Sequence, residues 1–151
     1  MLIKKILMVM VALIITLPAN AKEILQFSDA WIPEAPPVVK VMAGYVKIKN
    51  PTATAIDINK VTSPDFEKVE MHLTIEKDGM SRMQKQDIVS VAAHDEMIFQ
   101  RGGLHLMLIN AKHVMKRGEK ITLNFSTNKS TFTVMAEIKE ASIGDPSHHQ
   151  H

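Results

Sequence analysis

The chain has 151 residues, of which 46% are hydrophobic and 23% are charged, so it has the length and apolar content for one domain with a buried core. It contains no cysteine, which excludes disulfides, thiolate metal sites and thiol nucleophiles. The formal net charge of +2 is supplied by Lys4 and Lys5, and the neutral remainder argues against a nucleic-acid-binding protein.

Residues 1–21 have the layout of a cleaved secretory signal peptide. Two lysines precede an almost unbroken apolar run over residues 6–17, Pro18 follows it, and Ala19-Asn20-Ala21 offers small residues to a signal peptidase. The run is short for a membrane span, and no cysteine follows it that could be lipidated. We therefore expect a periplasmic protein with no stable membrane anchor, and a retained N-terminal anchor is the alternative.

The residues after this segment predict short β-strands separated by turns. The expected strands, rich in β-branched or apolar residues, lie at 24–32, 41–49, 55–62, 66–76, 80–86, 88–92, 96–99, 104–109, 120–126 and 131–138. Only residues 111–116 are compatible with a helical turn. This spacing favours a single all-β domain, a sandwich or barrel over residues 22–141, followed by a flexible His-rich tail over 142–151.

Alternation along residues 69–76 places His72 on the face away from the core, because the odd positions are apolar and the even positions are polar. Asp78-Gly79 predicts a two-residue hairpin turn. With that turn, Met83 lies opposite Thr74 and diagonal to His72, on the same solvent-exposed face. A three-residue turn would move Met83 to the other face.

Alternation in residues 104–108 places three leucines on a core face and places His105 and Met107 together on the opposite, solvent-exposed face. Residues two apart on a strand are separated by about 6.6 Å, near enough to share one ion. Thioether and imidazole ligands suit Cu(I), whereas a blue-copper electron-transfer site would need a cysteine. The sequence therefore predicts a Cu(I) site at His72, Met83, His105 and Met107.

The spacing His72-x10-Met83-x21-His105-x-Met107 resembles that of the periplasmic PCu(A)C copper chaperones. The surrounding sequence is also similar, notably in residues 70–72, 102–108 and 43–46. Arg101 stands where the family usually has Pro, and Leu104 stands where an aromatic residue is common.

The resemblance implies a cupredoxin-like Greek-key β-sandwich that binds Cu(I) through two His and two Met ligands. It also implies delivery of copper to the copper-site subunit of cytochrome c oxidase, alongside Sco-like thiol proteins.

The tail carries three histidines, His148, His149 and His151, together with Asp145. Such a composition can bind Cu(II), and the alternative is a solvated tail with no metal role.

We expect a carrier rather than an enzyme, because no Ser/His/Asp set or carboxylate pair stands out. The alternatives are a copper buffer without specific delivery and a metal-free sandwich. The other side chains of interest have structural interpretations. Met71, Met80, Met97, Met115 and Met135 are expected in the core, Met42 is ambiguous, His94 and His113 are expected at the surface, and Trp31 and Tyr45 are expected to anchor the fold.

Overall fold

The computed structural model describes residues 24–141, which form ten β-strands and no helix. The strands are β1 (Gln26–Pro33), β2 (Val41–Lys49), β3 (Ile56–Thr62), β4 (Phe66–Lys77), β5 (Met80–Gln86), β6 (Val89–Val91), β7 (Glu96–Phe99), β8 (Leu104–Ala111), β9 (Lys120–Thr127) and β10 (Thr131–Lys139). Each expected strand is present, with ends that differ from the expected ones by two residues at most.

Residues 111–116 do not form a helical turn: Ala111 ends β8, and an irregular loop follows it. Within 24–141 the structure has no helix long and apolar enough to cross a membrane.

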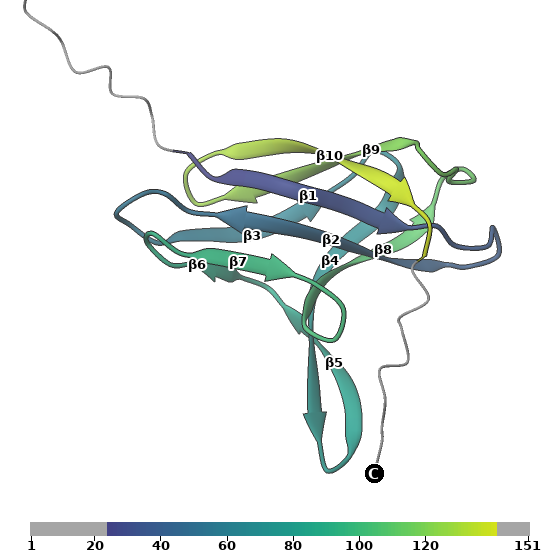
Figure 1. Cartoon of the computed structure of the whole chain (residues 1–151), viewed down its shortest axis with the longest axis horizontal. Coiled ribbons are helices and arrows are strands. Elements are labelled where there is room, and N and C mark those ends of the chain that lie inside the picture. Colours follow the sequence, from purple (N-terminus) through teal and green to yellow (C-terminus); the bar gives the residue numbers. More distant parts are fainter. Residues whose placement is uncertain (1–23, 142–151) are drawn as a thin grey trace, which may run out of the picture.

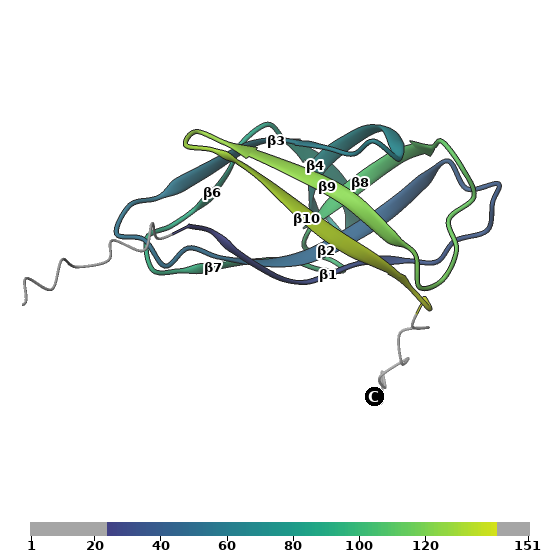
Figure 2. The same ribbon diagram turned by 90° about the horizontal axis from the view of Figure 1, so that it is seen from above.

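All ten strands belong to one sheet that is rolled around a common core (Figures 1 and 2). The strand order is β5-β4-β8-β2-β1-β10-β9-β3-β6, and β7 pairs with β2 beside this path. The first and last strands, β1 and β10, run parallel, and every other pair is antiparallel. The prediction of an all-β sandwich or barrel is confirmed.

Alternating side chains of the strands fill the core, as the period of two in the sequence predicts. On β8, Leu106 and Leu108 are fully buried, and on β9 the buried positions are Ile121, Leu123 and Phe125. These side chains pack into one apolar cluster with residues of the other strands. Burial of this surface is the main favourable contribution to folding.

A close approach between β2 and β8 depends on Gly44. The two strands pair from Val41↔Ile109 to Gly44↔Leu106. A Cβ atom added at Gly44 would lie 3.3 Å from the Cβ of Leu106 and 3.3 Å from Cδ1 of Leu108. The absence of a side chain here lets β8 lie flat against β2, and β8 carries two of the predicted copper ligands.

The β4–β5 hairpin projects from the body of the domain (Figure 1). Its turn residues Asp78 and Gly79 both have positive φ values, 55° and 72°, as a two-residue type I′ turn requires. The pairing runs from Met71↔Gln86 to Lys77↔Met80 and includes Thr74↔Met83. The predicted hairpin and its register are therefore confirmed.

Candidate metal centre

His72 on β4 and His105 on β8 lie directly opposite each other in the sheet. Residues paired in this way present their side chains on the same face. The ring centroids are 6.2 Å apart, and the ring planes are inclined by 36°. The face that bears His72, Met83, His105 and Met107 is called the His–Met face below.

His105 is buried, with 7% of its surface exposed, which corrects the expectation of a solvent-exposed position. Alternation identified the correct face, but β8 is an interior strand between β4 and β2. Side chains on both neighbours therefore limit the access of water to this histidine. Its Nδ1 donates a hydrogen bond of 3.0 Å to the carbonyl oxygen of Gly103. A carbonyl only accepts, so the proton is on Nδ1 and the lone pair is on Nε2.

A carboxylate fixes the other ring. Nε2 of His72 lies 2.9 Å from Oε2 of Glu70. Hydrogen bonding from Lys68, together with that from His72 and the charge of Lys85, lowers the pKa of Glu70 to about 2. The carboxylate is therefore ionised at neutral pH, and the ring nitrogen donates to it.

This contact leaves the lone pair of His72 on Nδ1, which is buried and has no hydrogen-bond partner in the part of the chain that the structure describes. A buried polar atom without a partner costs about 1–3 kcal/mol. Metal-ligating histidines commonly donate their second nitrogen to a carboxylate or a backbone carbonyl. Both rings have this arrangement, so the lone pairs on Nδ1 of His72 and Nε2 of His105 are available to coordinate a metal ion.

The two methionines flank the histidine pair from opposite directions. Met107 lies opposite Glu70 and is half-buried. Met83 lies opposite Thr74 and is 63% exposed, because β5 is an edge strand. Sheet register thus places all four predicted ligands on neighbouring rows of one face, with one of them at its open edge.

Within residues 24–141, no group of three or more His, Asp or Glu side chains is placed to hold a metal ion. The additional soft donors on the His–Met face are the thioether sulfurs of the two methionines. Sulfur and imidazole nitrogen together favour Cu(I) over the hard divalent cations.

Sequence reasoning assigned no role to Glu70. Its position was nonetheless indicated, since it is two residues before His72 and alternation puts both on one face. Its contact with the ring depends on side-chain rotamers, which the sequence does not provide.

Two methionines expected in the core are exposed instead. Met80 is 54% exposed at the tip of the hairpin, and Met135 is 51% exposed on the outer face of β10. Met71 and Met115 are buried as predicted, Met97 packs against the core, and Met42 is also buried. His94 and His113 are exposed, as expected.

The predictions for residues 1–21 and for His148, His149 and His151 lie outside the described residues.

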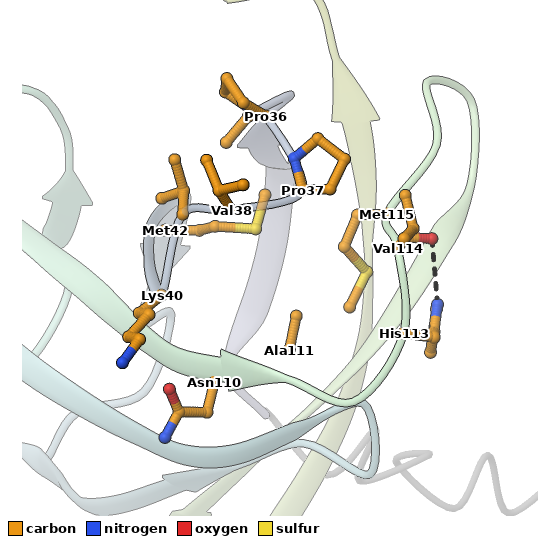
Figure 3. Close-up of a pocket in the computed structure, with 12 residues that line it drawn as sticks. Pro36, Pro37, Val38, Lys40, Met42, Asn110, Ala111, His113, Val114 and Met115 are labelled. Carbon is orange, nitrogen blue, oxygen red and sulfur yellow. Dashed lines mark hydrogen bonds between the residues drawn. The ribbon is translucent and has the colours of Figure 1, made fainter.

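A groove of about 410 Å³ opens near the C-terminal end of β8 (Figure 3), and none of the four predicted ligands lines it. Its lining is largely apolar and includes Pro36, Pro37 and Met115. His113 lies at its side and bonds to the carbonyl of Val114 over 3.2 Å. The other nitrogen of this histidine lies 3.3 Å from Oδ1 of Asp65, in the connection between β3 and β4, and His113 is not part of the His–Met face.

Comparison with known proteins gives both a family and a fold. Residues 25–138 match the family described as "Putative lipoprotein LpqE-like". A protein of Leifsonia xyli subsp. xyli described as "Putative lipoprotein Lxx21020" is 30% identical over 128 residues, covering 83% of this chain and 75% of that protein.

Among solved structures, the copper-bound PCuAC domain from PmoF2 gives a TM-score of 0.66 at 15% identity and covers 78% of this chain and 93% of that one. The Cu(I) form of DR1885 from Deinococcus radiodurans gives 0.64 at 23% identity, covering 84% and 87%. The apo form of DR1885 gives 0.62 at 24% identity, covering 84% and 85%. These similarities confirm the predicted cupredoxin-like fold.

Proposed function

The chain belongs to the LpqE-like family, and from this premise and the His–Met face we propose that it is a copper chaperone of the cell envelope. It binds one Cu(I) ion through His72, His105, Met83 and Met107 and passes the ion to another protein. It acts as a carrier and not as an enzyme.

The observation that carries this proposal is the pair of histidines with their second nitrogens already engaged. Nδ1 of His72 is buried without a hydrogen-bond partner. A metal ion would bind its lone pair in place of a hydrogen-bond donor. The structural neighbours include a copper-bound PCuAC domain and a Cu(I)-bound protein. Thioether sulfur completes a ligand set with the softness that Cu(I) prefers.

The four ligands have different tasks in this proposal. Glu70 and the Gly103 carbonyl hold the two imidazoles in place, so the binding of copper costs little further side-chain entropy. Met107 adds a half-buried sulfur. Met83 is the exposed ligand, so a donor atom of the acceptor replaces it first, and the histidines release the ion afterwards.

We place the protein outside the cytoplasm, in the periplasm, because residues 1–21 have the features of a secretory signal and its relatives are described as lipoproteins. The 151 residues contain no cysteine, so they offer no thiol to which a lipid could be attached. The acceptor in this proposal is the copper-site subunit of cytochrome c oxidase, with Sco-like thiol proteins acting on the same route. The His-rich tail serves as a secondary Cu(II) site.

The proposal is tested by anaerobic Cu(I) titration of residues 22–151 against a competing chelator, beside a chain that ends at Ile143. We expect tight one-to-one binding in both. The variants His72→Ala and His105→Ala should weaken it at least about 100-fold, because the loss of a metal ligand costs more than the loss of the group that orients it, which costs about 10–100-fold. His94→Ala, which removes an exposed loop histidine, is the matched control.

Equal binding by the His72, His105 and His94 variants would contradict the proposed site, and binding only by the longer chain would move the function to the tail. X-ray absorption of the Cu(I) complex should show sulfur together with nitrogen scatterers. A transfer assay with an apo oxidase fragment separates delivery from storage, since a copper buffer would retain its ion.

A further inference from the structure

A bulge in β1 lies beside an aromatic pair. The pairing of β1 with β2 is interrupted between Ser28 and Trp31, and Asp29 has a φ of 51°. Asp is one of the few residues besides Gly that adopt a positive φ readily, and bulges are over-represented next to functional sites, where they redirect a side chain. Beyond the bulge, the rings of Trp31 and Tyr45 have centroids 5.0 Å apart.

These aromatic residues line a groove of about 420 Å³ that is open to solvent. Ile98 and Phe99 of β7 form part of its wall, and Ile98 is 39% exposed. An exposed apolar groove with an aromatic side is typical of a surface that binds another molecule.

The charge at this groove is unbalanced at one end. Lys47 is neutralised by Asp29, whose carboxylate lies 2.9 Å from its Nζ. Arg101 also lines the groove, and within residues 24–141 its side chain forms no ion pair and no hydrogen bond. The groove therefore presents an apolar floor with one uncompensated cation.

The groove and the His–Met face share a loop. Arg101 is followed by Gly102, which has a φ of 70°, and by Gly103, whose carbonyl accepts the hydrogen bond from His105. The same carbonyl also accepts from the backbone N–H of Thr74 on β4, at 3.1 Å. Arg101 is thus four residues before His105 in the chain, and the loop that carries it is hydrogen-bonded to β4 at Thr74.

We propose that this groove is the docking surface for the protein that receives the copper, and that it binds a segment with an acidic side chain next to an aromatic or aliphatic one. The carboxylate pairs with Arg101, and the apolar side chain packs over Trp31 and Tyr45. The identity of the partner rests on the proposed function; the recognition chemistry of the groove does not.

The test uses copper-free protein and two model peptides, Ac-Gly-Asp-Phe-Gly-NH2 and Ac-Gly-Asn-Phe-Gly-NH2, followed by 15N NMR. We expect shifts to concentrate on the Trp31 indole, Ile98 and the 100–103 loop. Because an exposed ion pair contributes about 0.2–1 kcal/mol, the Asn peptide should bind roughly 1.4- to 5-fold more weakly than the Asp peptide. Arg101→Gln should reduce affinity for the Asp peptide by the same factor and leave the Asn peptide unchanged.

Arg82→Gln, which alters an exposed arginine on β5 outside the groove, is the matched control and should leave both affinities unchanged. Shifts elsewhere on the molecule, equal binding of the two peptides, or an Arg101→Gln protein that behaves like the parent would each overturn the proposal. Self-association that Arg101→Glu abolishes would also overturn it, because the occupant would then be a second copy of the chain. Cu(I) titration of Arg101→Gln should match the parent, so failure of the docking surface and failure of the copper site give different results.

Discussion

The two histidines of the His–Met face are held by different kinds of partner. A charged side chain, Glu70, orients His72, whereas a backbone carbonyl orients His105. A backbone partner is present whatever the side chains are, so the orientation of His105 is secured by the fold itself. The orientation of His72 depends on one carboxylate that Lys68 and Lys85 keep ionised.

Replacement of Glu70 tests this dependence. We expect Glu70→Ala to weaken Cu(I) binding about 10–100-fold, the usual cost of losing the group that orients a ligating histidine. Glu70→Gln should weaken it less, because the amide oxygen still accepts from Nε2 of His72. Competitive anaerobic titration measures both, and Glu76→Gln on the same strand is the control. Equal losses in the Ala and Gln variants would mean that the charge, and not the orientation of the ring, is what matters.

His113 offers a separate test in the loop after β8. The carbonyl of Val114 and then the carboxylate of Asp65 raise its pKa, with Nε2 lying 3.3 Å from Oδ1 of Asp65. A raised pKa in the folded protein means that the protonated ring stabilises the fold below the unfolded value of about 6.5. This contribution disappears as the pH rises through the folded value.

NMR titration of the His113 ring should therefore show a pKa above 6.5. In Asp65→Asn the pKa should fall but stay raised, because the Val114 contact remains. Asp87→Asn, outside this cluster, should not change it. A His113 pKa that is the same in the parent and in Asp65→Asn would show that the ion pair is absent in solution.

At the scale of the elements, the hairpin and its register could be predicted because they depend on local signals. Alternation identifies the face of each strand, and Asp78-Gly79 specifies the turn. Burial depends instead on which strands are neighbours. His105 is buried because β8 is interior, and Met80 is exposed because it lies at the hairpin tip. The burial of His105 cannot be read from residues close in sequence, whereas the tip position of Met80 can, because Met80 directly follows the predicted turn Asp78-Gly79. The choice of donor nitrogen on His72 requires the rotamer of Glu70 as well.

The turn can be weakened without touching a ligand. Gly79 has a φ of 72°, where a residue with a Cβ is less stable by about 1–2 kcal/mol. Gly79→Ala should therefore speed amide hydrogen exchange in β5 and reduce Cu(I) affinity, because Met83 lies on that strand. Ser81→Ala, at a regular strand position, is the control. Unchanged exchange in β5 would show that strand pairing, and not the turn, holds the hairpin.

At the scale of the whole molecule, the rolled sheet makes the His–Met face and the core two sides of the same strands. Pairs such as Met71↔Leu106 face the core, and pairs such as His72↔His105 face away from it. A substitution that disturbs core packing should therefore also displace side chains of the His–Met face. The close contact at Gly44 is the most sensitive point for such a test.

Gly44→Val should destabilise the domain by about 1–3 kcal/mol, the usual cost of overpacking, since even a Cβ would lie 3.3 Å from Leu106. Urea unfolding measures the loss, and Asn59→Val at an exposed strand position is the control. A change in the free energy of unfolding below about 0.5 kcal/mol, as surface substitutions give, would show that β2 and β8 can move apart to accommodate the larger side chain.

The edge position of β5 has a further consequence for the rate at which copper leaves. A strand with a neighbour on one side only opens at a lower free energy than the interior of a sheet, so it fluctuates while the rest of the domain stays folded. In the proposed site, each such fluctuation lifts the sulfur of Met83 away and leaves the ion on the remaining three ligands. The two histidines would then determine how tightly copper is held at equilibrium, and the fraying of one strand would determine its residence time.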